Sequence, residues 1–244
     1  MARKKETSKR VVAVILGAGQ GTRVGYRVNK VFLPINGKPI IIYAVETFER
    51  CRAIDEIILV VAAGEEEQMM KLARHAQCIK VSRVIRGGPT RHESEQCALE
   101  VLRPHIEAGA VEIVLIHDGA RPFVSVEKVE QLIVKARESD GAILAIPLQE
   151  EERIAQMSSE RYVQRSFEGE QVWKVQTPQA FQASLLLKAY DQAKRDMFLG
   201  TDTAASVERI GGHIAIIESD GSNLKITTAH DLFLAERLTS LRRG

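Results

Sequence analysis

The chain has 244 residues, of which 45% are hydrophobic and 27% are charged, a composition typical of a globular protein with one large domain or two small ones. Its formal net charge of +2 argues against a surface that coats nucleic acid, and no run of residues approaches the roughly 18 apolar residues of a membrane span. Three widely spaced cysteines without a C-x-x-C pair predict reduced thiols in a cytoplasmic protein.

After a charged, polar stretch at residues 1–10, strand-like and helix-like segments alternate. We expect the stretch to be a flexible tail and residues 11–244 to form a single domain. The expected strands are residues 11–16, 57–62, 81–85, 112–117, 142–147 and 214–218, and the expected helices are residues 39–50, 66–75, 92–102, 126–139, 183–195, 203–210 and 230–242. Continuous Val, Ile and Leu runs indicate strands buried on both faces. The alternation therefore predicts an α/β fold, a mostly parallel sheet with helices on each side.

One region, from Leu148 to Trp173, interrupts this alternation because it is long and polar. Segments of such length are usually functional or are extensions of the fold. Residues 161–163 and 172–175 carry β-branched and aromatic side chains, which favour strands. We therefore expect an insertion at about 148–177 that forms a protruding β-arm, with a disordered loop as the alternative. An arm of this kind commonly packs on a partner subunit.

A glycine-rich loop follows the first expected strand. Gly17, Gly19 and Gly21 let the backbone turn tightly and bring its N–H groups close to an anion, and Arg23 and Lys30 add two positive charges. The spacing matches neither G-x-G-x-x-G nor G-x-x-x-x-G-K-[ST], which argues against a dinucleotide-binding oxidoreductase and against a P-loop. We interpret the segment as a cradle for a triphosphate; a turn that only reverses the chain is the alternative.

A second candidate site follows the expected strand at 112–117. Ligands of open α/β sheets bind beyond the carboxyl ends of the strands, which places Asp118 on the same edge as the glycine loop. A single carboxylate suits Mg²⁺, or another divalent cation, held jointly with substrate phosphates, and Arg121 suits a phosphate. The alternative is an aspartate that caps the helix at 126–139 beside a surface arginine.

Three further segments carry candidate residues. Gly88 and Ser94 lie at a strand-to-helix junction, where a helix N-terminus favours polar or anionic ligands, and Ser94 or Arg91 could contact a ribose or base; a capped helix start is the alternative. Lys225 precedes the last expected helix and could neutralise phosphate charge, or it is a solvated surface lysine. Thr177, at the end of the arm, offers a hydroxyl donor.

The order of the motifs "GAGQGTR…K", "GGPTRHES", "IHDGARP", "QTPQ", "TD" and "NLKIT" resembles that of the 2-C-methyl-D-erythritol 4-phosphate cytidylyltransferases, from about residue 11 to residue 238. "HDGARP" is the most diagnostic piece, because sugar nucleotidyltransferases in general share the glycine loop. The resemblance implies a Rossmann-like nucleotidyltransferase fold, a three-layer sandwich, and a homodimer whose arms interlock. It also implies a Mg²⁺-dependent reaction between CTP and a polyol phosphate that releases pyrophosphate, with no nucleic-acid or membrane partner.

The resemblance assigns roles to the matching positions of this chain. The catalytic residues would be Arg23, Lys30, Asp118 and Lys225, with Asp118 also the metal ligand. The CTP-binding residues would be Gly17, Ala18, Gly19, Gly21, Gly88 and Ser94. The acceptor-binding residues would be Arg121, Thr177 and Thr201.

The chain departs from the family pattern at three places. Asn29-Lys30-Val31 stands for the usual Pro-Lys-Gln, Glu150-Glu151 for the usual Asp-Thr, and Gly169 for an arginine. The last two belong to the half that holds the acceptor's phosphate, which Arg161 or Arg165 could hold instead. Two alternatives therefore stand beside the implied activity: a cytidylyltransferase for another polyol phosphate, such as ribitol 5-phosphate, and a non-catalytic relative that binds nucleotide.

Overall fold

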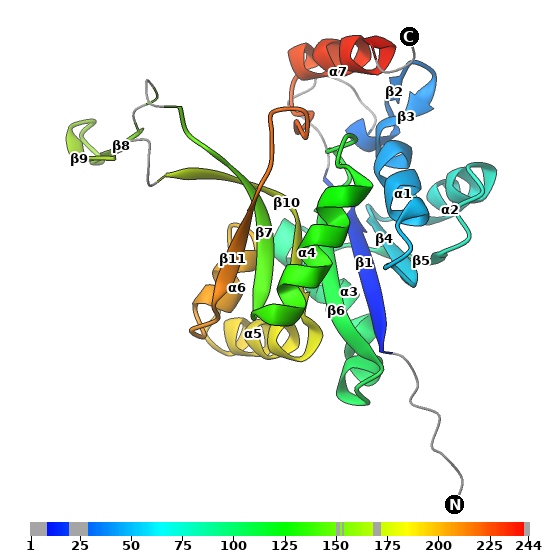
Figure 1. Cartoon of the computed structure of the whole chain (residues 1–244), viewed down its shortest axis with the longest axis horizontal. Coiled ribbons are helices and arrows are strands. Elements are labelled where there is room, and N and C mark those ends of the chain that lie inside the picture. The colour runs from blue at the N-terminus through cyan, green and yellow to red at the C-terminus, as the bar shows by residue number, and fades with distance from the viewer. Residues whose placement is uncertain (1–8, 20–28, 150–151, 153, 168–171, 242–244) are drawn as a thin grey trace, which may run out of the picture.

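The computed structural model describes residues 9–19, 29–149, 152, 154–167 and 172–241, and Figure 1 shows their arrangement. Within these residues seven strands form one sheet in the order β11-β7-β10-β6-β1-β4-β5. β10 is antiparallel to both of its neighbours, and the other adjacent strands are parallel to one another. The expected α/β fold with a mostly parallel sheet is confirmed.

The elements lie close to their expected ranges. The strands of the sheet are β1 (Arg10–Leu16), β4 (Glu56–Val61), β5 (Val81–Arg86), β6 (Val111–Asp118), β7 (Gly141–Pro147), β10 (Trp173–Gln182) and β11 (Ile214–Glu218). The helices are α1 (Ile40–Arg50), α2 (Glu66–His75), α3 (Arg91–Glu107), α4 (Val126–Glu138), α5 (Ala183–Arg195), α6 (Thr203–Glu208) and α7 (Ala229–Leu241), and η2 (Lys30–Phe32) is a 3₁₀ turn. Two small sheets stand apart, β2 (Pro34–Ile35) with β3 (Lys38–Pro39) and β8 (Ile154–Met157) with β9 (Val163–Phe167).

Helices cover both faces of the large sheet. On β1, the side chains of Val11, Ala13 and Ile15 belong to the apolar cluster shared with α1, α2 and α4, while Val12 and Val14 belong to the cluster shared with α3, α5 and α6. This alternation is the period of two expected of a strand. Each fully buried Val or Ile contributes about 1.5–3 kcal/mol to folding, so the two clusters hold the predicted three-layer sandwich together.

The strand expected at 172–175 belongs to the central sheet and continues to Gln182. The sequence pattern hides this because Pro178 lies inside the strand. Its pairing with β7 shifts register between Val175 and Gln179, and at such an irregularity a proline costs no ladder hydrogen bond. β10 inserts between β6 and β7 and so brings Thr177 beside the end of β6.

The β8–β9 hairpin projects away from the body of the molecule, as Figure 1 shows. The protruding β-arm is therefore confirmed, but the strand expected at 161–163 is wrong. Arg161, with a φ of 66°, and Tyr162 lie in the connection between β8 and β9, and only Val163 begins a strand. Glu150, Glu151 and Gly169 lie outside the described residues.

Helix α3 extends past its expected end at residue 102. It continues through Pro104 to Glu107, although an interior proline removes a backbone donor and disfavours a helix, because the apolar face of the helix is well packed. Leu99, Leu102 and Ile106 of this face are buried. No helix in the described part of the chain is long and apolar enough to cross a membrane.

Candidate active site at the carboxyl edge of the sheet

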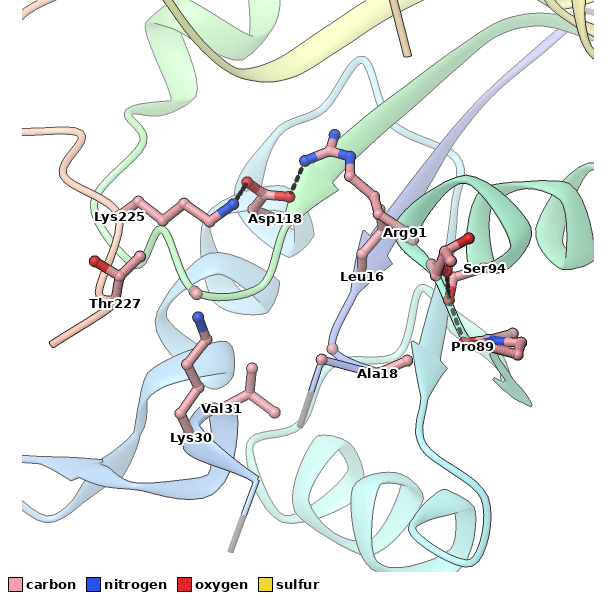
Figure 2. A pocket seen from close by; sticks show the side chains of 15 residues that line it. Leu16, Ala18, Lys30, Val31, Pro89, Arg91, Ser94, Asp118, Lys225 and Thr227 are labelled. Atoms are coloured by element: carbon pink, nitrogen blue, oxygen red, sulfur yellow. Dashed lines mark hydrogen bonds and ion pairs between the residues drawn. The ribbon is translucent and has the colours of Figure 1, made fainter. Parts of the chain in front are cut away.

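A cavity of about 360 Å³ opens at the edge of the sheet where β1, β5 and β6 end. Its walls come from the loop after β1, the turn η2, the β5–α3 junction, the end of β6 and the segment before α7. Carboxyl ends of parallel strands form the usual ligand-binding edge of an open α/β sheet. Figure 2 shows charged side chains from several of these segments converging on this space.

Asp118, the last residue of β6, is surrounded by cations. Its Oδ1 accepts a hydrogen bond from Arg91 Nη1, and its Oδ2 lies 2.7 Å from Lys225 Nζ and 3.8 Å from Arg121 Nε. In Figure 2 the Arg91 and Lys225 side chains approach the carboxylate from opposite sides. The carboxylate thus joins the start of α3 to the segment before α7.

The charge of Asp118 is strongly favoured. Burial on its own raises the pKa of this carboxyl group, but Arg91, Lys225 and Arg121 outweigh burial and hold the pKa well below its usual range. Among the described residues that line the cavity, Asp118 is the only acid, while Lys30, Arg91 and Lys225 are basic. The cavity therefore carries net positive charge with one ionised carboxylate at its centre, which favours polyphosphate anions.

A chain of buried hydrogen bonds holds the backbone of Asp118. Its N–H donates to Thr177 Oγ1 at 3.0 Å, this hydroxyl lies 3.2 Å from His117 Nδ1, and His117 Nε2 lies 3.0 Å from the Arg121 carbonyl oxygen. Burial lowers the pKa of His117 to about 4, so the ring is neutral at pH 7. A carbonyl can only accept, so we assign the ring proton to Nε2, and Nδ1 accepts from Thr177.

Arg121 lies behind the cavity and links two of its walls. Its Nη1 donates to the carbonyl oxygen of Asn223 at 2.8 Å, and the Asn223 Nδ2 donates to the carbonyl oxygen of Thr177 at 2.9 Å. These bonds fix the segment that carries Lys225 against the loop after β6 and the middle of β10.

Asn29 ties η2 to the start of the glycine loop. Its Nδ2 donates to the carbonyl oxygen of Gly17 at 2.6 Å and to Glu65 Oε2 at 2.9 Å, and its Oδ1 accepts from the Val31 N–H at 3.3 Å. The adjacent Lys30 extends along the cavity wall, as Figure 2 shows. Asn29, one of the departures from the family pattern, thus positions the lysine that follows it.

The β5–α3 junction needs glycine at two positions because of close packing. A Cβ on Gly87 would lie 2.6 Å from Ser94 Oγ and 2.8 Å from the Ala18 Cβ, and a Cβ on Gly88 would lie 2.4 Å from the Glu93 Cβ. Thr90 caps α3 in a capping box with Glu93. The junction therefore brings the start of α3 against the loop after β1.

The cavity brings together most of the residues proposed from the sequence. Those that line it are Gly17, Ala18, Gly19, Lys30, Gly88, Ser94, Asp118 and Lys225. Arg121 and Thr177 contact Asp118 from behind, and Thr201 is exposed between α5 and α6. Gly21 and Arg23 lie outside the described residues, and the roles of all these side chains stay predictions.

Comparison with known proteins establishes the family. Residues 11–240 match the family model described as "IspD: 2-C-methyl-D-erythritol 4-phosphate cytidylyltransferase". The chain belongs to this family. Named members of the IspD family from Shouchella clausii and Geobacillus kaustophilus are 40% and 39% identical to it, over 95% and 94% of this chain and 97% of each relative.

Solved structures of the IspD family share its fold. The crystal structure of 4-diphosphocytidyl-2C-methyl-D-erythritol synthase from Anaerococcus prevotii superposes with a TM-score of 0.81 at 28% identity, covering 95% of this chain and 96% of that one. The 2-C-methyl-D-erythritol 4-phosphate cytidylyltransferase from Thermus thermophilus gives a TM-score of 0.72 at 29% identity, covering 93% of this chain and 98% of that one.

A hard cation at this site would take most of its oxygen ligands from water or from a bound substrate. Among the described residues, no group of three or more His, Cys, Asp or Glu side chains is placed to bind a metal. Asp118 supplies one carboxylate, and both of its oxygens lie beside cationic side chains. A donor set of this kind fits a cation that shares its coordination sphere with substrate phosphates.

Arg91 is the cavity residue to which the sequence assigned the least definite role. The motif at 87–94 suggested contact with a ribose or base, whereas the structure directs the Arg91 guanidinium to the Asp118 carboxylate. The sequence feature that could have indicated a role for Arg91 is its position in the first turn of a helix that begins at the edge of the sheet. The pairing with Asp118 depends on tertiary packing, which no local pattern reports.

Proposed function

We propose that this chain transfers CMP from CTP to 2-C-methyl-D-erythritol 4-phosphate, giving 4-diphosphocytidyl-2-C-methyl-D-erythritol and pyrophosphate in non-mevalonate isoprenoid biosynthesis. The observation that carries the proposal is the placement of Asp118, Lys30 and Lys225 around one cavity in a member of the IspD family. The cavity's positive lining suits a triphosphate, and its position matches the ligand-binding edge of the fold.

In the proposed reaction an oxygen of the acceptor's phosphate attacks the α-phosphorus of CTP. A new P–O bond forms as the bond between the α-phosphorus and the bridging oxygen of the β-phosphate breaks, and the electron pair leaves with pyrophosphate. Lys30 and Lys225 stabilise the charge on the phosphorus centre, and Arg23 is assigned the same role from the sequence. Such chemistry depends on positioning and charge stabilisation rather than on a protein nucleophile.

We propose Mg²⁺ as the cofactor and Asp118 as its protein ligand. Mg²⁺ when bound would neutralise phosphate charge and orient the leaving pyrophosphate. For Asp118 to serve as ligand, Arg91 and Lys225 must share or release the carboxylate oxygens they now contact. Their charges then become available to the triphosphate.

We also propose a homodimer formed through the β8–β9 arm. Ile154, Met157, Tyr162 and Val163 of this hairpin are exposed apolar side chains, and a hairpin of this size is marginal in water without a partner surface. The arm also carries Arg161 and Arg165, and one or the other is our candidate for holding the acceptor's phosphate. Separately from the dimer, we propose a cytoplasmic location for the protein, as expected from the cysteine pattern.

The experiment that tests the proposal measures pyrophosphate release with Mg²⁺, CTP and a panel of acceptors. We expect release with 2-C-methyl-D-erythritol 4-phosphate and little with ribitol 5-phosphate or with water alone. Faster turnover of ribitol 5-phosphate would assign the chain to a different acceptor. CTP binding without pyrophosphate release for any acceptor would favour a non-catalytic relative.

A further inference from the structure

A buried carboxylate lies directly behind the cavity and takes no part in the mechanism above. Glu95 is on α3, one turn after Arg91, and is 1% exposed. Its Oε1 accepts from Arg91 Nε at 2.8 Å and from Thr203 Oγ1 at 3.0 Å, and its Oε2 accepts from the Tyr190 hydroxyl. A charge this deeply buried is tolerated only when such partners satisfy it.

The partners on two other helices fix Glu95 in place. Thr203 begins α6 and Tyr190 lies on α5, and both are buried. The Tyr190 ring also stacks on His92 of α3, with 4.6 Å between ring centroids and 12° between ring planes. Glu95 is therefore a rigid anchor, and Arg91 is its partner on the cavity side.

The anchor determines how the Arg91 guanidinium is oriented. Nε is used by Glu95 and Nη1 by Asp118, and Nη2 is buried with no hydrogen-bond partner among the described residues. A guanidinium is a planar, rigid fork of donors, so fixing Nε fixes the direction of both Nη atoms. The side chain lines the cavity beside Ser94, as Figure 2 shows.

We propose that Glu95 is a positioning residue for CTP: it holds Arg91 so that Nη1 of the guanidinium contacts a phosphate oxygen of the bound nucleotide. The inference rests on the proposed function because it takes CTP as the ligand. An ionised phosphate is a strong acceptor for a guanidinium. Nη1, the nitrogen that reaches Asp118, carries a second N–H that this contact does not use.

The test is CTP binding measured by isothermal titration calorimetry with Mg²⁺ and no acceptor, so that no turnover occurs. Glu95→Gln keeps the shape of the side chain but removes its charge. We expect the Kd for CTP to rise about tenfold, since a hydrogen bond to a charged group is replaced by a neutral one.

Asp191→Asn is the matched control. Asp191 also links α5 to α3, through an ion pair of 2.7 Å with Arg103, but it lies away from the cavity. Both variants remove one carboxylate charge between the same two helices, so an effect of the lost charge on the contact between α3 and α5 would appear in both. We expect Asp191→Asn to bind CTP with wild-type affinity.

A double-mutant cycle separates positioning from a merely structural effect. If Glu95 acts through Arg91, then Glu95→Gln has no further effect on the Kd for CTP in an Arg91→Gln background. Equal, additive losses in both backgrounds would overturn the proposal, as would a wild-type Kd for Glu95→Gln.

Arg91→Lys keeps the inference testable even if Glu95→Gln does not fold. A lysine keeps the charge but cannot contact Glu95 and Asp118 with one rigid fork, so we expect a Kd within threefold of that of Arg91→Gln. Wild-type affinity for Arg91→Lys would show that only the charge matters and would overturn the inference. Failure of the wild-type chain to bind CTP would instead overturn the proposed function itself.

Discussion

The Nζ of Lys225 lies 2.7 Å from Oδ2 of Asp118, an ion pair that joins the end of β6 to the segment before α7. Because Arg91 contacts the other carboxylate oxygen, Asp118 is neutralised from both sides. Binding of a polyphosphate with a divalent cation at this point requires these charges to be redistributed. The proposed activity therefore depends on side chains from three separate parts of the chain.

Replacing Lys225 by methionine keeps most of the side chain's volume and removes its charge. We expect kcat/KM for CTP and acceptor to fall about 100- to 1000-fold, the usual effect of removing one group that stabilises transition-state charge. Steady-state pyrophosphate release checks this. Lys71→Met, at an exposed i,i+4 pair with Glu67 on α2, is the control and keeps wild-type activity; a similar loss in both variants would contradict a specific role for Lys225.

Replacing Gly87 by alanine places a methyl group 2.6 Å from Ser94 Oγ and 2.8 Å from the Ala18 Cβ. Because both neighbours line the cavity, we expect weaker CTP binding as well as a lower free energy of unfolding, by about 1–3 kcal/mol as for other overpacked sites. Calorimetric titration and urea unfolding measure the two effects. Gly221→Ala, where an added Cβ meets nothing within 4 Å, should change neither.

His117 predicts a dependence of stability on pH. Its pKa is lowered from 6.5 to about 4 in the folded chain by burial, so the folded state favours the neutral ring. The resulting stability is fully present above pH 6.5 and is lost as the pH falls toward 4, which amounts to about 2 kcal/mol between pH 7 and pH 5. Urea unfolding of the wild type and of His117→Gln at both pH values isolates this contribution; equal losses in the two proteins would show that His117 does not supply it.

The arm predicts the oligomeric state. Tyr162 and Val163 are 71% and 62% exposed at the β8–β9 hairpin, so the pair of substitutions Tyr162→Glu and Val163→Glu should convert a dimer into a monomer. Mass measurement by light scattering at working concentration checks this. Ile79→Glu, at an even more exposed apolar residue outside the arm, should leave the dimer intact, and a monomeric wild type would refute the interlocked arms.

The fold could be predicted from the sequence where apolar periodicity was uninterrupted. The expected ranges 66–75, 183–195 and 214–218 agree with α2, α5 and β11, because both helices bury an apolar face and Ala215 and Ile217 of β11 pack against the core. Two features could not be predicted from periodicity: β10, whose Pro178 lies at a register shift, and the connection at Arg161 and Tyr162. The aromatic side chain of Tyr162 favoured a strand there, but it is exposed to solvent in the arm.

The candidate site was predictable in part for a different reason. Asp118 and the glycine loop follow neighbouring strands, and the parallel-sheet rule alone brings them to one edge. The role of Glu95 could not be foreseen, since its partners Tyr190 and Thr203 come from helices whose packing against α3 is set by the tertiary fold. The local sequence around Glu95 indicates only one turn of a helix whose start is capped.

The most direct test of the central claim is ³¹P NMR of the wild-type chain with Mg²⁺, CTP and 2-C-methyl-D-erythritol 4-phosphate, beside Asp118→Asn and Lys30→Ala. Transfer of CMP predicts loss of the triphosphate signals and equal growth of pyrophosphate and of two coupled signals from a new diphosphate ester. Both variants should retain the wild-type fold by circular dichroism and form product at least 100-fold more slowly. Release of free CMP instead of a diphosphate ester, or near-normal product formation by either variant, would contradict the proposed mechanism.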